Sequence, residues 1–399
     1  MKLSKLTIGL LSATSIMLCG QLSASSLVKI GDSVKTTEQD LVTIALPEHK
    51  VEQQAVHYSQ RISADSQLKL APQAYNSSSD EYWFEVSGKE LNRGIAVSVS
   101  QPGALIRLSG KRSTAIDSAM QSIDPAHLEL SKDNNKLSSP FSQSVTQEQL
   151  ATANIFPNSS AVKLNKTLGA GKFNLRVTQA LDNNQRYIIN VKEKGSAHKL
   201  QVALPKQSYL SGETLHFNAG IYRDDQVLAD SSHQAFIKLP SGEKQPVNLA
   251  VKDGQYRVEV PQGLETAPLG KLYELHLSSQ ATDNGTRIKR NGKVAFAVAR
   301  QTAQLTGAVE VLNDQALVAL EVASEGRYEV SALVSGTDSR GQLTRVMLSR
   351  SAYYLEPGSH KVALNFDTTI LADAGVKAPY KVENLRLMDQ SRMALLAQQ

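Results

Sequence analysis

Short alternations of apolar and polar residues, each ended by a turn signal, run along most of the chain. In the segment QPVNLAVKDGQYRVEVP, residues 245–261, Asp253-Gly254 is a two-residue hairpin signal. A turn at this point puts every apolar residue of the segment on one face, so the pattern predicts an antiparallel hairpin. The predicted pairs are Lys252 with Gln255, Val251 with Tyr256, Leu249 with Val258, and Val247 with Val260.

The same alternation recurs in other parts of the chain. It predicts strands in EYWFEVSG, GALIRLSG, RYIINVKE and GRYEVSALVSG, and in HKVALNF after the turn at Pro357-Gly358. Helical spacing is confined to two short candidates, residues 116–123 and EQLATANIF at 148–156. Short strands joined by hairpins favour β-sandwiches. We therefore predict an all-β fold.

Changes in strand pattern divide the chain into three predicted domains. We expect a β-rich, sandwich-like N-terminal domain over 25–197 and immunoglobulin-like sandwiches over 198–300 and 301–399. The first boundary lies at the Gly195-Ser196 turn, and the second follows the apolar run VAFAVA. The polar stretch 131–144 is expected to form a long loop within the first domain.

The first 24 residues have the three parts of a secretory signal. Lys2 and Lys5 precede an apolar run from Leu6 to Leu18, and a cleavage point follows Ala24. The run is shorter than the roughly 20 residues that a spanning helix needs. We therefore expect a secreted or periplasmic mature protein without a transmembrane segment.

Cysteine usage agrees with export. The single cysteine, Cys19, lies inside the signal, so cleavage leaves a chain without thiols. Such a chain has no disulfide, cysteine nucleophile or cysteine-ligated metal. Lipid attachment at Cys19 is the alternative, and the bulky Leu18 before it argues against that modification.

The charge of the mature chain is mild. Removal of Lys2 and Lys5 leaves 41 of the 43 basic residues against 38 acidic ones. Nucleic-acid binding is not expected, because basic residues would have to gather on one face. The densest basic segment, TRIKRNGK, contains Arg287, Lys289, Arg290 and Lys293. It predicts either a solvated strand or a site for anionic polysaccharide or phosphate.

Other candidate chemistry is sparse. Trp83, between Tyr82 and Phe84, is a candidate sugar platform, with core packing of the three rings as the alternative. The chain has no GxSxG or HExxH motif, and its eight histidines are scattered singly. Asp224, Asp225, Asp283 and Asn284 are expected to form turns rather than a calcium site. No cofactor or metal site is predicted.

Three segments carry a resemblance to a known family. GKELNRGIAVSVSQPGALIRLSG, LGAGKFNLRV and the tail from AYYLEPGSHKVALNF to the C-terminus are similar to an exported bacterial family described as domain of unknown function 4785. Residues 208–299 also resemble an extracellular bacterial immunoglobulin-like domain. The resemblance implies a β-rich domain followed by two immunoglobulin-like sandwiches, and export from Gram-negative cells, with type II secretion as a route. It implies no catalytic residues.

These observations favour a secreted, non-catalytic and monomeric binding protein with a protein or glycan partner at a cell surface. An accessory glycan- or peptide-binding protein of an extracellular hydrolase system is the first alternative. An unrecognised hydrolase in the N-terminal domain is the second. The fold does not rank these possibilities, because sandwiches carry many functions.

Overall fold

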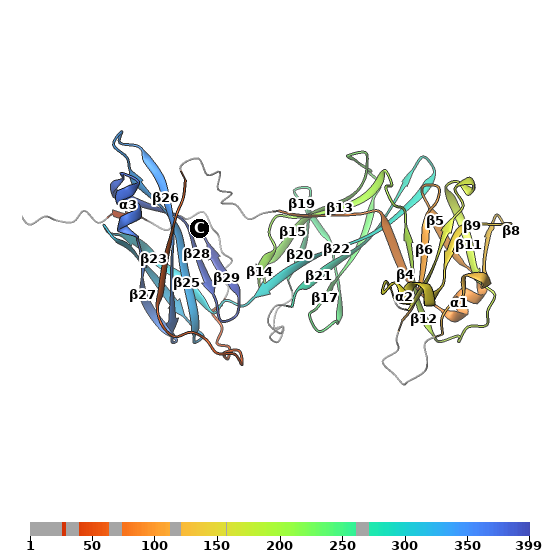
Figure 1. The fold of residues 1–399 in the computed structure, drawn as a ribbon, viewed down its shortest axis with the longest axis horizontal. Helices are drawn as coiled ribbons and strands as arrows, with labels where there is room; N and C mark the ends of the chain where they lie inside the picture. The colour runs from red at the N-terminus through yellow and green to blue at the C-terminus, as the bar shows by residue number, and fades with distance from the viewer. Residues whose placement is uncertain (1–25, 29–39, 64–73, 112–120, 157, 261–270) are drawn as a thin grey trace, which may run out of the picture.

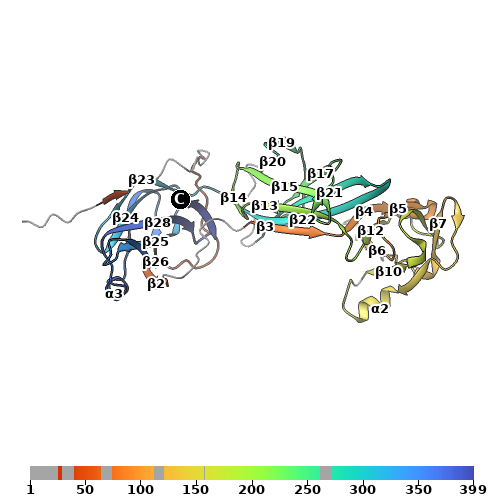
Figure 2. The ribbon, with the colours of Figure 1, turned by 90° about the horizontal axis from the view of Figure 1, so that it is seen from above.

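The computed structural model describes residues 26–28, 40–63, 74–111, 121–156, 158–260 and 271–399. Strands dominate, and each α-helix in these residues has six residues. Buried apolar side chains form three clusters, each between two mainly antiparallel sheets. The three sandwiches follow one another along the long axis, with the middle one (green) between the other two (Figures 1 and 2). The predicted all-β sandwich fold is confirmed.

The first sandwich packs a five-stranded sheet against a four-stranded sheet. The larger sheet has the order β4 (Glu81–Ser87), β12 (Arg186–Lys192), β6 (Leu105–Lys111), β10 (Ser159–Leu164) and β9 (Phe141–Val145). The smaller sheet has the order β5 (Ile95–Val99), β11 (Gly171–Val177), β7 (Leu128–Lys132) and β8 (Asn135–Lys136). Burial of side chains such as Ile106, Phe173 and Ile189 holds the two sheets together.

Short helices connect some of these strands. α1 (Gly88–Arg93) begins with a capping box in which Ser87 and Glu90 bond each other's backbone. α2 (Gln147–Thr152) has the same arrangement with Thr146, which confirms helix formation within residues 148–156. Two 3-10 turns, Pro125–His127 and Lys166–Leu168, complete the set in this sandwich.

One sequence prediction for this region is wrong, and another falls mostly on residues that the structure does not describe. The predicted long loop over 131–144 is wrong, because it contains β8 and most of β9. Positive φ at Asp133 and Asn134, both residues that tolerate this conformation, lets the chain turn back from β7 to β8. The helical candidate over 116–123 lies mostly outside the described residues, as do Cys19 and the predicted signal.

The middle sandwich also has two sheets. One has the order β19 (Ala250–Lys252), β20 (Gln255–Glu259), β15 (Thr214–Arg223), β13 (His198–Leu204) and β3 (Tyr75–Ser79), with β16 (Gln226–Val227) beside β15. The other has the order β14 (Ser208–Leu210), β22 (Thr286–Ala299), β21 (Tyr273–Asp283), β17 (Ser232–Lys238) and β18 (Lys244–Val247).

The predicted hairpin forms in this sandwich, but it is shorter than expected. Residues 250–252 pair with 255–257 in the predicted register, and Asp253 and Gly254 have φ values of 53° and 75°. The predicted continuation through Leu249 and Val247 is wrong. Val247 pairs with Ala235 in the opposite sheet, so the chain crosses between the sheets just before the hairpin.

The third sandwich contains the C-terminus. Its first sheet has the order β1 (Ser26–Val28), β23 (Ala303–Val311), β24 (Gln315–Val322) and β27 (Gly358–Asn365). Its second sheet has the order β2 (Val56–Arg61), β26 (Leu343–Leu355), β25 (Gly326–Thr337), β28 (Lys377–Asp389) and β29 (Ala394–Gln398). The helix α3 (Thr368–Asp373) begins at Asp367, whose carboxylate accepts two backbone N–H bonds.

The N-terminal strands contribute to more than one sandwich. β1 and β2 pair with strands of the third sandwich, and β3 pairs with β13 of the middle one. The chain enters the first sandwich only at β4. The boundaries at 24, 197 and 300 stay a prediction, to which the pairing adds that β1 and β2 lie in the third unit and β3 in the middle one. No helix in the described ranges is long and apolar enough to cross a membrane.

Candidate functional site

The predicted basic cluster lies on β22, where strand alternation separates its four side chains. Arg287, Lys289 and Lys293 lie on one face and Arg290 on the other. Arg287 donates a hydrogen bond to a side-chain amide on β21, and Lys293 Nζ lies 2.7 Å from Glu274 Oε1. Lys289 is half-buried. These three residues stay a predicted anion site.

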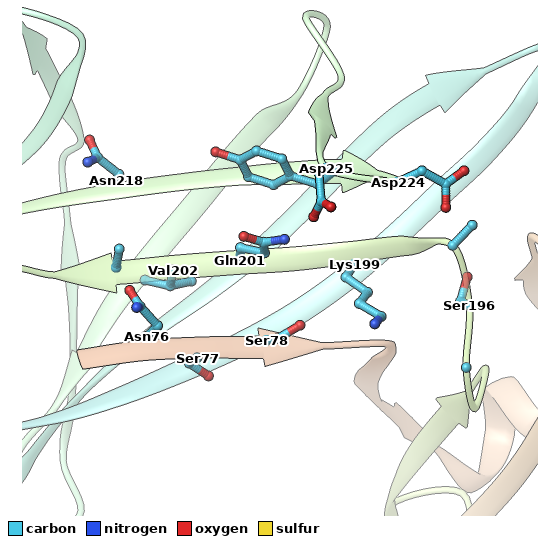
Figure 3. Close-up of a pocket in the computed structure, with 14 residues that line it drawn as sticks. Asn76, Ser77, Ser78, Ser196, Lys199, Gln201, Val202, Asn218, Asp224 and Asp225 are labelled. Atoms are coloured by element: carbon cyan, nitrogen blue, oxygen red, sulfur yellow. The ribbon is translucent and has the colours of Figure 1, made fainter. Parts of the chain in front are cut away.

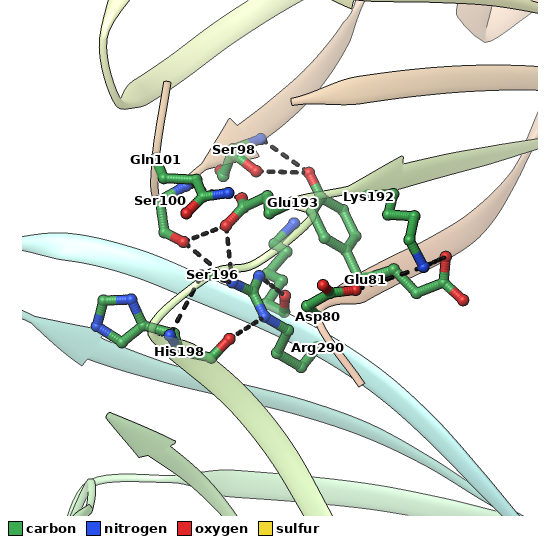
Figure 4. Close-up of polar contacts among 12 residues, drawn as sticks. Asp80, Glu81, Ser98, Ser100, Gln101, Lys192, Glu193, Ser196, His198 and Arg290 are labelled. Carbon is green, nitrogen blue, oxygen red and sulfur yellow. Dashed lines mark hydrogen bonds and ion pairs between the residues drawn. The ribbon is translucent and has the colours of Figure 1, made fainter. Parts of the chain in front are cut away.

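Arg290 does not belong to an exposed site. Its side chain is fully buried where the first and middle sandwiches meet, and Nη2 lies 2.7 Å from Glu193 Oε2 (Figure 4). The same nitrogen donates to Ser100 Oγ and Ser196 Oγ at 3.0 Å each, while Nε donates to His198 O at 3.0 Å and Nη1 to Lys289 O at 2.7 Å. The expectation that Arg290 binds an external anion is wrong, because its guanidinium group is already paired with the Glu193 carboxylate inside the protein.

The connection between the two sandwiches is fixed around this ion pair. Glu193 Oε1 accepts the backbone N–H of Ser100 at 2.7 Å, and Glu193 N donates to Asp80 O at 3.0 Å. Asp80 Oδ2 then accepts the N–H of Gly195 at 3.0 Å. Burial raises the pKa of the neighbouring Tyr82 hydroxyl, which exchanges hydrogen bonds with the backbone of β5. The arrangement is structural and holds one sandwich against the next.

The three adjacent aromatic residues on β4 alternate as a strand requires. Tyr82 is buried and stacks on Phe84 with ring centroids 6.0 Å apart, so this pair faces the core. Trp83 points the other way and is half-buried. Its carbonyl accepts a hydrogen bond from Asn291 at 3.2 Å. Its role as a sugar platform stays a prediction.

A groove that the sequence did not indicate lies on the outer face of the β3-β13-β15 sheet (Figure 3). Its volume is about 630 Å³. Antiparallel pairing sets Ser78 and Gly220 on either side of Gln201, and it sets Asn76 and Asn218 on either side of Ala203. Small residues therefore form the floor, and amide side chains from three strands stand around it.

The polar groups of this groove are free to bind a ligand. The side chains of Asn76, Gln201, Asn218 and Tyr222 have no hydrogen-bond partner among the described residues. Each amide offers two donors and an acceptor, so the groove presents both functions without fixed charge along its centre. Lys199 lines the same groove beside Tyr222.

One end of the groove is acidic. Asp224 and Asp225 have positive φ at an exposed turn, which confirms them as turn formers. Nearby, Asp283 Oδ2 lies 2.8 Å from His198 Nε2 and 2.9 Å from Arg223 Nη1. The hydrogen bond from His198, and then the Arg223 charge, lower the pKa of the Asp283 carboxyl. Asn284 also adopts positive φ in its turn.

The groove is lined by hydroxyl, amide and charged side chains, among them Ser77, Ser78, Ser196 and Lys199. Across the described ranges, no group of three or more His, Asp or Glu side chains is placed to hold a metal ion. The GTDSRG string at Gly336–Gly341 lies at the turn between β25 and β26, where Asp338 bonds Arg340 and the backbone of Gln342.

Sequence reasoning missed the groove because its residues come from three separate segments. The outward positions of HKLQVAL are polar, a signal that is typical of any solvated strand face. Nothing local shows that Asn76 comes next to β13, since Asn76 and its pairing partner Ala203 are 127 positions apart in the sequence.

Comparisons with known proteins give a family and a fold. No curated protein matches the chain. Among solved structures, a DUF4785 family protein from Legionella pneumophila superposes with a TM-score of 0.65 and 21% identity, covering 90% of this chain and 96% of that one. Salmonella α-2-macroglobulin gives a TM-score of only 0.22, at 10% identity over 84% of this chain and 24% of that one. That value supports no argument.

The family assignment comes from both ends of the chain. Residues 47–193 match the N-terminal domain, and residues 302–399 match the C-terminal domain, of the family described as domain of unknown function DUF4785. The resemblance noted in the sequence is thus confirmed, and its sandwich fold agrees with the Legionella structure. This β-rich, multidomain chain belongs to the DUF4785 family.

Proposed function

We propose that this protein is an exported, non-catalytic binding protein whose middle sandwich takes an uncharged segment of a glycan in the β3-β13-β15 groove. One observation carries the proposal. The amides of Asn76, Gln201 and Asn218 face one groove, and none of them has a hydrogen-bond partner in the described part of the chain. Polar groups that converge without partners are typical of a ligand site.

The chemistry of the groove suits sugar hydroxyls. A hydroxyl group both donates and accepts hydrogen bonds, and a side-chain amide does the same. Tyr222 adds an aromatic ring, which provides apolar contact and a polar tip. The small side chains of Ser78 and Ala203 leave room for a ring to approach the sheet.

Export is the second part of the proposal. The basic head, apolar run and small residues of positions 1–24 support secretion or periplasmic delivery. The type II route that the resemblance implied remains part of this proposal. Mass spectrometry of the protein from its native host should give a chain that begins at or near Ser25. Retention of Met1 to Ala24, or a lipid on Cys19, would contradict soluble export.

The groove is tested by a glycan array probed with the mature chain, followed by calorimetry on the best neutral oligosaccharide. Gln201→Ala and Asn218→Ala should each weaken binding about tenfold, the equivalent of losing one ligand hydrogen bond of about 1.4 kcal/mol. Gln234→Ala is the matched control, because Gln234 is exposed on the opposite sheet of the same sandwich. It should leave affinity unchanged.

Two results would overturn the groove as a glycan site. The first is an array on which no neutral glycan binds the mature protein. The second is a bound glycan whose affinity is unaffected by Gln201→Ala and Asn218→Ala. Capture of an extended peptide in place of a glycan, with loss on Gln201→Ala, would assign the groove to peptide recognition.

A further inference from the structure

The outer face of the third sandwich carries a row of residues that the groove does not involve. Tyr58 on β2 pairs with Arg350 on β26, Arg350 pairs with Ser331 on β25, and Ser331 pairs with Arg386 on β28. Directly opposed residues of antiparallel strands put their side chains on the same face. The four side chains therefore form one continuous row across the sheet, which we call the Tyr58–Arg386 row.

The row faces away from the core. Tyr328, Val330, Ala332 and Val334, the alternate residues of β25, belong to the buried apolar cluster of this sandwich. Ser331 therefore points outward, yet it is only 6% exposed. Its neighbours Arg350 and Arg386 are two strand spacings apart, about 10 Å. Long side chains such as arginine on the two flanking strands can cover a serine in this position.

The positive charge of this row is only partly compensated. Arg345 and Lys381 both bond Glu383, at 3.0 Å and 2.9 Å. Glu329 accepts a hydrogen bond from Gln390, and its Oε1 lies 3.9 Å from Arg350 Nη1. Glu329 and Glu383 are the acidic residues that the pairing places beside the row, and both already have partners within the protein.

Arg386 is the exception among these cations. Its side chain has no ion pair or hydrogen bond with any described residue, and its Nε is buried without a partner. A buried donor left unpaired is unusual in a folded protein, and such a group is commonly satisfied by ordered water or a bound ion. Arg386 is thus available to an anion, and Arg350 lies within reach of the same anion.

The other end of the row is aromatic and open. Tyr58 is 60% exposed, the highest value among the aromatic residues that are largely exposed. Val56, two residues earlier on the same face, is 48% exposed. A large exposed aromatic residue on an edge strand, with Arg350 on the neighbouring strand, offers a flat apolar surface next to a guanidinium group.

We propose that the Tyr58–Arg386 row binds an acidic sugar of the uronic acid type. The carboxylate lies against the guanidinium forks of Arg350 and Arg386, whose paired N–H donors match a carboxylate geometrically. The sugar ring packs on Tyr58. The open sheet surface favours a chain-like ligand with ring faces over a small free anion, which needs an enclosing pocket. The proposal does not depend on the groove, which lies on another sandwich.

The test measures binding of an oligogalacturonate to the mature chain by calorimetry, at low salt and at 0.15 M salt. We expect binding that weakens with salt, and no binding of a neutral oligosaccharide to this row. Arg386→Gln and Arg350→Gln should each lower affinity tenfold or more. Arg386→Lys, which keeps the charge but removes the fork, should lower it several-fold, as should Tyr58→Ser.

Controls separate this site from folding defects and from the groove. Arg340→Gln alters an exposed arginine at the turn after β25 and should leave affinity unchanged. Gln201→Ala should also leave oligogalacturonate binding unchanged. Thermal unfolding of each variant should match that of the parent protein.

Three results would overturn the proposal. One is full affinity in Arg386→Gln, and another is an equal loss in Arg340→Gln. The third is tighter binding of inorganic phosphate, a sulfated oligosaccharide or a single-stranded oligonucleotide than of oligogalacturonate, which would assign the row to a different anion.

Discussion

Arg290 and Glu193 form an ion pair between two different sandwiches, with Nη2 and Oε2 2.7 Å apart and side-chain exposures of 0% and 1%. A charge this deeply buried is tolerated only when it is paired and hydrogen-bonded. Ser100, Ser196 and the carbonyl of His198 provide the remaining bonds. The first and middle sandwiches are thus joined by a polar contact that neither can satisfy alone.

Arg290→Met should therefore be strongly destabilising. Removal of the guanidinium leaves Glu193 charged and buried, which costs about 3–5 kcal/mol. Urea unfolding should show this loss, and trypsin should cleave faster after Lys194, which lies in the released connection. Lys293→Met is the control from the same strand, because its exposed bond to Glu274 is worth less than about 1 kcal/mol.

The double variant Arg290→Met, Glu193→Gln provides the internal check. It removes both charges, so it should recover part of the stability that the single change loses. Equal stability of Arg290→Met and Lys293→Met would show that the buried pair does not hold the sandwiches together.

Local chemistry in the sequence predicted local structure well. Asp253-Gly254 indicated a turn and a three-residue register that the structure confirms. The crossing at Val247 could not be seen, because alternation reports which residues face a core and not which sheet provides the pairing partner. Asp133 and Asn134 were read as loop residues for a similar reason, since a turn signal does not reveal whether strands flank it.

The candidate sites depended on contacts between distant segments. Arg290 looked like a surface cation because Glu193, 97 residues away, is not visible in its local pattern. The row that ends at Arg386 needs β2, whose His57 bonds Ser351 from 294 residues away. Long-range pairing of this kind leaves no periodic signal in either segment.

The pairing of β2 with β26 can be tested with two adjacent prolines. Ile62 N donates to Val346 O at 2.8 Å. Because N–H groups along a strand point alternately to either side, the N–H of Gln60 also points toward β26, whereas the N–H of Ser59 points away from it. Gln60→Pro should lose a ladder hydrogen bond and destabilise the third sandwich by about 1–3 kcal/mol. Ser59→Pro should be much milder, since proline is tolerated where an edge strand faces solvent.

Hydrogen exchange of β26 measures the outcome directly. Amides of residues 347–352 should exchange faster in Gln60→Pro than in Ser59→Pro. Equal exchange in the two variants would indicate that β2 does not protect this edge of the sheet.

Glu274 should make the middle sandwich sensitive to acid. Burial raises the pKa of this carboxyl, but hydrogen bonds from Lys293 and His276 and the Lys238 charge outweigh it and lower the pKa to about 2. A folded pKa below the ordinary value of 4.5 stabilises the protein above pH 4.5, and this stabilisation is lost as pH falls toward 2. Glu274→Gln should therefore be less stable than the parent at pH 6, by about 1 kcal/mol.

Urea unfolding at several pH values checks this expectation. The two unfolding curves should converge as pH approaches 2. Glu243→Gln changes an exposed carboxylate in the turn between β17 and β18 and should leave the pH profile unchanged. A constant difference between Glu274→Gln and the parent at all pH values would contradict the electrostatic origin of the effect.

The turn at Asp253-Gly254 gives the most local prediction. Gly254 has φ of 75°, a left-handed conformation that a β-branched residue resists, and a side chain added there would meet no atom within 4 Å. Gly254→Val should therefore destabilise the middle sandwich through backbone strain alone, by about 1–3 kcal/mol. Gly254→Asn should lose less stability, because asparagine adopts this conformation readily. Lys252→Ala should change stability by less than about 0.5 kcal/mol.

Urea unfolding followed by circular dichroism should rank the three variants in that order, with valine the least stable. Equal losses for valine and asparagine would show that the positive φ of Gly254 is not what the hairpin requires.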